Sequence, residues 1–127
     1  MNSPSDTTIK MADYYIDVRV GGELSVDVLL DLGRRMSEAM REHRCPRILI
    51  DLTDVQVIYD AGGDFGFLDR ILSASFEAIS IAVVTTKQAT QHIEATVNYL
   101  DTSHATAEVF SSIDAAKSWL STRVTSK

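Results

Sequence analysis

A carboxylate, a hydroxyl and an amine follow two apolar segments of the sequence, where they could take part in phosphoryl transfer. Asp51 ends one segment, and Thr85 or Thr86 with Lys87 ends another. Ligands of open α/β sheets bind at the carboxyl ends of parallel strands. Phosphoryl transfer also needs a bound magnesium ion, and no acidic pair ends the preceding strand to hold one. We therefore expect Asp51 and Thr85 to satisfy turn amides, and we predict that the chain is not an enzyme.

Histidine and cysteine, the other common catalytic and metal-binding residues, are sparse. His43, His92 and His104 are far apart in the sequence, and none has a partner at metal-ligand spacing. Cys45 is the only cysteine, and no base or oxyanion site accompanies it. The sequence thus predicts no metal site, no cofactor and no cysteine nucleophile.

Composition limits the class of protein rather than its ligand. The chain has 127 residues and a net charge of −6, which suits one globular domain. Its acidity opposes nucleic-acid binding through phosphate contacts. No run approaches the roughly 18 apolar residues that a membrane span needs, and the first residues do not resemble a secretory signal. We expect a cytoplasmic protein.

Apolar periodicity predicts a strand followed by a helix, four times over. Apolar residues between 26 and 43 recur at three- and four-residue steps, which predicts a helix there with Ser25 as its cap. Gly21-Gly22 predicts the turn before that helix. The other predicted elements are strands over 14–20, 47–52, 78–85 and 106–110, and helices that open at Asp64, at about Gln88 and at Ser112 or Asp114.

This order predicts an α/β fold. Alternating strands and helices force crossover connections, so the four repeats form a mainly parallel sheet with helices packed on it. Residues 1–12 are polar and aperiodic, which predicts a flexible tail before a single domain over 13–124. Residues 53–63 are too apolar for a free loop, and we expect them to fold back under the next helix.

Two segments resemble a known family. The central motif of STAS domains, the anti-sigma-factor antagonist fold, is similar to residues 50–63, IDLTDVQVIYDAGG. The close of SpoIIAA-like proteins, in the STAS/SEC14-type grouping, is similar to residues 108–120, EVFSSIDAAKSWL. The resemblance spans about residues 14–122. It implies a STAS/SpoIIAA-like fold and a bacterial-type regulatory module without catalysis.

The resemblance breaks at the position that matters most for regulation. In regulatory STAS domains, a partner kinase phosphorylates a serine at the turn that opens the helix. One alignment places Ala61 at that position and another places Asp60 there. Neither residue offers a hydroxyl, so the phosphorylation switch does not carry over. Asp60 imitates a phosphate poorly, because one carboxylate has less charge and fewer acceptor oxygens.

Aromatic and aliphatic residues are dense between positions 57 and 76. Phe65 and Leu68 point one way on the predicted helix and Phe67 points another way, so one sheet face cannot bury them all. We predict that this region contacts a protein partner or forms a homodimer. The predicted contact residues are Tyr59, Asp60, Gly62, Gly63, Phe65, Phe67 and Arg70.

A second function, of a different class, fits the same region. The apolar helix could cover a pocket, and the protein would then be a carrier or sensor of a small apolar, lipid-like ligand. The SEC14-like members of the wider grouping are lipid binders, so the resemblance gives this alternative some support.

Overall fold

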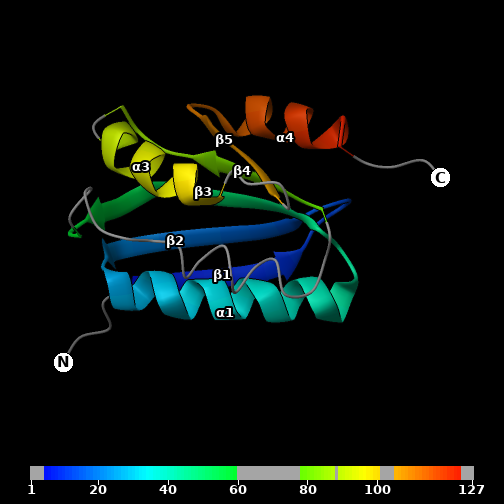
Figure 1. Ribbon diagram of the computed structural model, residues 1–127, viewed down its shortest axis with the longest axis horizontal. Helices are drawn as coiled ribbons and strands as arrows, with labels where there is room; N and C mark the ends of the chain where they lie inside the picture. Colours follow the sequence, from blue (N-terminus) through cyan, green and yellow to red (C-terminus); the bar gives the residue numbers. More distant parts are fainter. Residues whose placement is uncertain (1–4, 60–77, 88, 101–104, 124–127) are drawn as a thin grey trace.

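Five strands form one sheet (Figure 1): β1 (Ser5–Met11), β2 (Ile16–Leu24), β3 (Arg47–Val57), β4 (Ile79–Val84) and β5 (Ala105–Phe110). They lie side by side in that order. β1 is antiparallel to β2, and the other neighbouring pairs are parallel. The structure is a computed structural model that describes residues 5–59, 78–87, 89–100 and 105–123.

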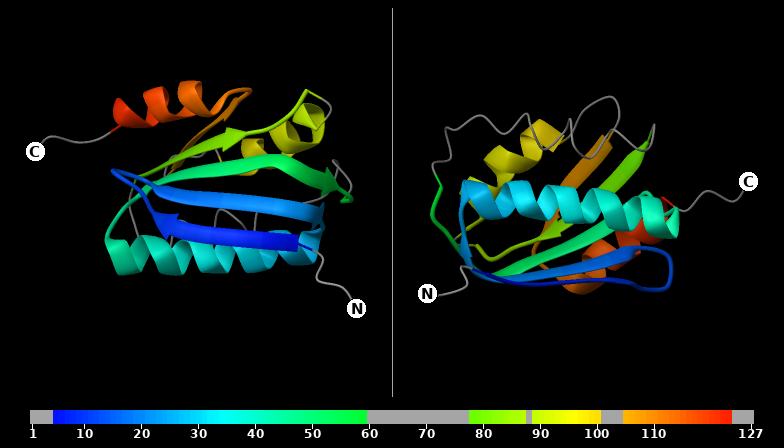
Figure 2. Two further views of the ribbon diagram at one scale, coloured as in Figure 1. Left: turned by 180° about the vertical axis from the view of Figure 1, so that it is seen from behind. Right: turned by 90° about the horizontal axis from the view of Figure 1, so that it is seen from below.

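Three helices of the described chain pack on this sheet: α1 (Val26–His43), α3 (Thr90–Leu100) and α4 (Ile113–Ser121). Side chains of α1 and α3 belong to the larger core cluster, whereas Ala116 and Leu120 of α4 belong to a second cluster. α1 and α3 therefore cover one face of the sheet and α4 covers the other (Figure 2). None of the described helices has the length and apolar character needed to cross a bilayer.

Alternation along β3 divides its side chains between the two clusters. Ile48, Ile50 and Leu52 belong to the larger cluster, and Leu49 belongs to the smaller one. Successive side chains of a strand point to opposite faces, so a strand covered on both sides must be apolar at nearly every position. This arrangement confirms the α/β fold with a mainly parallel sheet.

Helix α1 begins and ends where the sequence predicts. Ser25 is the N-cap, and its side chain accepts a hydrogen bond from the Val28 backbone N–H at 3.2 Å. At the other end, Arg44 adopts a left-handed conformation with a φ of 52°, and its backbone N–H donates to the Met40 carbonyl. The helix buries its apolar stripe against the sheet, with Val28, Leu29, Leu32, Gly33, Met36, Ser37, Ala39 and Met40 all buried.

The prediction of a tail over residues 1–12 is wrong for most of that segment. Residues Ser5–Met11 form β1, which pairs with β2 over its whole length. Ile9 and Met11 pack against the larger core cluster, while Thr8 and Lys10 are exposed. Apolar residues alternate over too few positions of this segment to predict a strand from the sequence. The hydrogen bonds that order the segment come from its pairing with β2.

The sheet also corrects two other predictions. Gly21-Gly22 does not end the strand but lies within β2, where the register shifts between Arg19 and Gly21 and Gly22 has a φ of 86°. The extra residue of this bulge lies on β3, between Asp51 and Asp54. Gly22 continues β2 at a positive φ, which carries no steric cost for a glycine. Residues 53–57 extend β3 instead of forming a connection, because they pair with the end of β2.

The later predictions agree with the described chain. β4, α3, β5 and α4 occupy the predicted stretches. Ser112 caps α4, since its hydroxyl accepts a hydrogen bond from the Ala115 backbone N–H at 3.1 Å. The helix predicted to open at Asp64 lies outside the described residues.

The N-cap of α1 gives a test of this fold. Ser25→Ala removes the acceptor for the Val28 N–H, and we expect the free energy of unfolding to fall by about 1 kcal/mol. Ser25→Asp keeps a capping oxygen and should retain most of that stability. Urea denaturation followed by circular dichroism measures both values. Equal losses in the two variants would show that the cap does not stabilise α1.

Candidate functional site

The carboxyl ends of β2 and β3 meet at one edge of the sheet, at the left in Figure 1. Leu24 is the register partner of Val57, and the Ile58 backbone N–H donates to the Leu24 carbonyl at 3.0 Å. α1 begins at Val26, only two residues after β2 ends. The start of the helix and the residue after β3 are therefore held next to each other.

This edge carries the large apolar side chains that the described chain leaves exposed. Val26 is 44% exposed and Ile58 is 50% exposed. Glu23, Asp27 and Gln56 beside them are also exposed. We call these five residues the carboxyl-edge patch. Isolated apolar side chains on a surface are ordinary, but adjacent ones are typical of a binding surface.

An open groove continues the patch toward α3. It lies between the last residues of β3 and the start of α3, and it adjoins Ile58 through Val57. Its lining residues are Val55, Gln56, Val57, Thr86, Ala89 and His92. Three of these six residues, Val55, Val57 and Ala89, are apolar, so the groove adds apolar side chains to a mixed surface at the edge.

The charges around the edge are negative. Glu23, Asp27 and Asp54 are exposed, and none of them forms an ion pair within the described part of the chain. Residues 20–33 and 48–59 contain no lysine or arginine. Arg19 of β2 lines one pocket together with Asp51 and Asp54, and Lys87 lies on the connection from β4 to α3.

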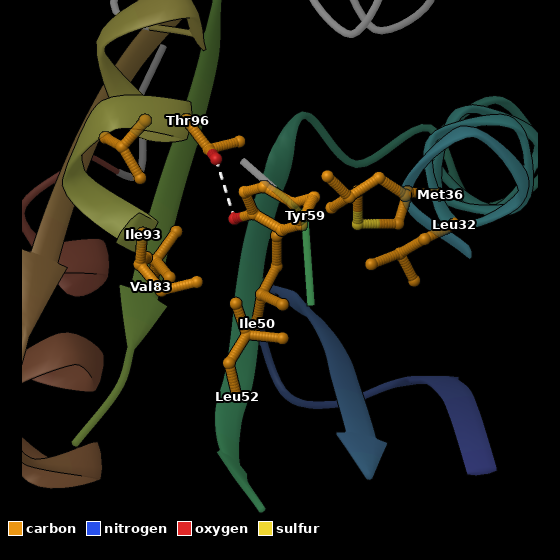
Figure 3. Close-up of a pocket in the computed structure, with 10 residues that line it drawn as sticks. Leu32, Met36, Ile50, Leu52, Tyr59, Val83, Ile93 and Thr96 are labelled. Atoms are coloured by element: carbon orange, nitrogen blue, oxygen red, sulfur yellow. Dashed lines mark hydrogen bonds between the residues drawn. The ribbon is translucent and has the colours of Figure 1, made fainter. Parts of the chain in front are cut away.

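Tyr59, the one predicted contact residue that the structure describes, points inward (Figure 3). It is 6% exposed, and its hydroxyl is 2.7 Å from the Thr96 hydroxyl of α3. Its ring also lies edge-on to His92, with centroids 6.5 Å apart. Burial raises the pKa of the Tyr59 phenol above 10.0, and the hydrogen bond with Thr96 offsets part of that effect.

Tyr59 lines a small apolar cavity between α1, the sheet and α3. The cavity has a volume of about 40 Å³. Figure 3 shows Tyr59 between Met36 on one side and Thr96 on the other. Its lining residues are Leu29, Leu32, Met36, Ile50, Leu52, Tyr59, Val83, Ile93, Thr96 and Val97.

The other predicted contact residues stay a prediction. Asp60, Gly62, Gly63, Phe65, Phe67 and Arg70 lie outside the described residues, as does Ala61. The predicted contact residues did not include Val26, Ile58 or Thr96. For Thr96 a signal existed, since a threonine between Ile93 and Val97 interrupts an otherwise apolar stripe of α3. Val26 could not be identified as a surface residue of this edge without knowing where the start of α1 lies in the fold.

The residues considered for catalysis are held in other interactions or face away. Asp51 lies within β3 rather than in a turn at the end of a strand, and its Oδ1 accepts hydrogen bonds from the backbone N–H and the hydroxyl of Thr53, at 3.0 and 2.7 Å. Thr85 differs from the expectation, because its buried hydroxyl has no hydrogen-bond partner in the described structure. Thr86 instead accepts a hydrogen bond from the Ala89 backbone N–H at 3.3 Å.

Cys45 and the described histidines, His43 and His92, also occupy structural rather than catalytic positions. Cys45 is fully buried, and its Sγ lies 3.6 Å from the carbonyl oxygens of Tyr14 and Arg47. His43 is exposed and His92 is half-buried. The described residues contain no group of three or more side chains able to hold a metal ion.

Comparison with protein families decides the relationship. A family model described as SpoIIAA-like matches residues 15–121. The chain belongs to the SpoIIAA-like family. This confirms the resemblance predicted from residues 50–63 and 108–120. A search of curated proteins finds no match for this SpoIIAA-like chain.

Two crystal structures share the SpoIIAA-like fold. An anti-sigma factor antagonist from Mycobacterium paratuberculosis is 19% identical with a TM-score of 0.57, over 95% of this chain and 99% of that one. An uncharacterized protein with a SpoIIAA-like fold from Shewanella loihica is 17% identical with a TM-score of 0.56, over 94% of this chain and 98% of that one. At such identities the likeness shows the fold alone.

The Tyr59–Thr96 pair predicts a measurable coupling between β3 and α3. Tyr59→Phe and Thr96→Val should each lower the free energy of unfolding by about 1 kcal/mol. The double variant should lose less than the sum, because replacing both partners leaves no unpaired hydroxyl. Urea denaturation of the four proteins measures the coupling, and strictly additive losses would contradict it.

The raised pKa of Tyr59 predicts a pH dependence. A tyrosine of the unfolded chain ionises near pH 10.0, whereas the buried phenol keeps its proton to higher pH. Its contribution to stability is therefore present below pH 10.0 and is lost as the pH rises above that value. Tyr59→Phe should show a shallower fall in the free energy of unfolding above pH 10 than the native protein. Tyr15, whose pKa burial also raises, is present in both proteins and contributes equally to both slopes. Identical slopes for the two proteins would therefore contradict the prediction.

Proposed function

We propose that this SpoIIAA-like protein is a non-catalytic regulatory module that binds a protein partner or a second copy of itself. The binding surface would combine the carboxyl-edge patch with the predicted contact region 57–76. In this proposal the module acts in the cytoplasm, where the sequence predicts it. The observation that carries the proposal is the exposure of two large apolar side chains, Val26 and Ile58, at the same carboxyl edge of the sheet.

The neighbourhood of Ile58 supports a binding role for this edge. Ile58 directly precedes Tyr59, which anchors the chain between β3 and α3 through its hydroxyl. Its backbone is also hydrogen-bonded to Leu24. An apolar side chain on such a restrained backbone loses little conformational entropy when a partner covers it. The adjoining groove adds Val55, Val57 and Ala89 to the apolar area.

The absence of a catalytic role is supported by the surroundings of Asp51 and Thr85. Asp51, the candidate nucleophile, already accepts two hydrogen bonds from Thr53. The Thr85 hydroxyl, its candidate companion, is buried away from solvent. A nucleophile and its helper must both reach a substrate, and this pair does not offer that geometry.

The apolar cavity gives the alternative function a specific site, but its size favours the interaction module. A cavity of about 40 Å³ holds little more than a water molecule, whereas an engineered cavity that takes up benzene measures about 150 Å³. A lipid-like molecule would have to push α1 and α3 apart. The hydroxyls of Tyr59 and Thr96 would give such a ligand its polar contact.

The proposal predicts that Ile58→Ser weakens association. Covering the exposed half of an isoleucine contributes about 1 kcal/mol, which corresponds to about a fivefold loss of affinity. Sedimentation velocity over a concentration series measures self-association. Quantitative mass spectrometry of proteins retained by the tagged chain measures partner binding.

Ala115→Ser, at an exposed site on α4, is the matched control. Equal self-association and equal partner recovery for the two variants would overturn the proposal. Native mass spectrometry followed by denaturing mass spectrometry tests the alternative. A small molecule that is released on denaturation, from a protein whose association Ile58→Ser leaves unchanged, would favour the carrier or sensor.

A further inference from the structure

Two acidic residues of the carboxyl edge are close to each other on the sheet. Glu23 pairs with Gln56 across β2 and β3, and Asp54 pairs with Gly21. Glu23 and Asp54 are therefore diagonal neighbours on the same face of the sheet. Both are exposed, and neither forms an ion pair within the described part of the chain.

The same sheet face carries the exposed apolar side chain. Positions 54, 56 and 58 alternate with the inward-facing Val55, Val57 and Tyr59, which pack toward the larger core cluster. Asp54 and Gln56 thus share their side of the strand with Ile58, and all three are exposed. Asp27 adds a carboxylate next to Val26. The patch therefore holds two exposed apolar side chains and two carboxylates, and Asp54 adds a third carboxylate on the side of β3 that carries Ile58.

This charge pattern opposes symmetric pairing of two copies through the patch. A two-fold interface brings the same surface of both subunits together. Glu23, Asp27 and Asp54 of one copy would then face the same carboxylates of the other. Like charges across an interface reduce affinity, and the net charge of −6 adds a general repulsion between copies.

We propose that the carboxyl-edge patch binds a basic segment of a different protein, with apolar anchors flanked by lysine or arginine. The inference rests on the proposed interaction function and names its partner. The anchors cover Val26 and Ile58, and the flanking cations pair with Glu23, Asp27 and Asp54. A basic partner would form ion pairs with these carboxylates, which have none within the described chain.

A set of synthetic helical peptides tests this inference on the full chain. The first peptide carries leucines at positions i and i+4 with lysines beside them, and two others replace every lysine with glutamine or with glutamate. Fluorescence anisotropy measures the affinity of each peptide. We expect the lysine peptide to bind most tightly and the glutamate peptide least tightly, with a difference that shrinks as salt screens the charges.

Protein variants locate the binding. Asp27→Asn and Glu23→Gln should each weaken binding of the lysine peptide by about twofold to fivefold, the range of an exposed ion pair. Neither change should affect the glutamine peptide. Asp114→Asn is the matched control, because Asp114 is an exposed acid in the first turn of α4, as Asp27 is in the first turn of α1.

Each outcome separates this inference from the proposed function. If Ile58→Ser weakens all three peptides while their charges make no difference, the basic partner is wrong and the binding edge stands. If Ile58→Ser changes none of them, both are wrong. A dimer of the native chain that Ile58→Ser dissolves would identify a second copy as the occupant and overturn the basic partner. Failure of the lysine peptide to bind the native chain would also overturn it.

Discussion

The parallel pairing of β3 on both sides is the constraint on which the rest of the structure depends. β3 pairs with β2 as far as Val57, but it pairs with β4 only as far as Asp51. Parallel neighbours need crossover connections, so the strands send their carboxyl ends to one edge and a helix starts beside it. Beyond Asp51, β3 has β2 on one side, and no strand of the described residues pairs with it on the other. The groove along Val55 and Val57 opens there, with the start of α3 as its far wall.

The two faces of the sheet are covered unequally. α1 and α3 share the larger cluster on one face, whereas α4 packs on β3, β4 and β5 on the other. The part of β1 and β2 that α4 leaves uncovered carries polar residues such as Thr8 and Arg19, and Arg19 lies 3.6 Å from Asp17. A half-covered antiparallel pair alternates between apolar and polar residues, and the sequence shows that alternation in β2. Glu23 and Asp54 continue the polar surface toward the edge.

Sequence reasoning succeeded where the signal is local. The bounds of α1 follow from one apolar stripe, a serine cap and Pro46 after its end, all of which can be read along the chain. β1 and the end of β3 were not predicted, because these segments form strands only by pairing with β2, which lies elsewhere in the sequence. Gly21-Gly22 was misread for the same reason, since β2 continues through these glycines by pairing with Asp54 and Val55 of β3. The patch also escaped prediction, because Val26 and Ile58 become neighbours only when β2 and β3 pair.

Ile58 and Tyr59 separate the two candidate functions at adjacent positions. Ile58 is half exposed beside Val26, while Tyr59 is buried against the cavity and bonded to Thr96. The reversal follows from the extended backbone, which points successive side chains to opposite sides. A partner at the edge would contact the first residue, and a ligand in the cavity would contact the second. Since Tyr59 also holds the chain against α3, the packing that closes the cavity is the packing that fixes the position of Ile58 at the surface.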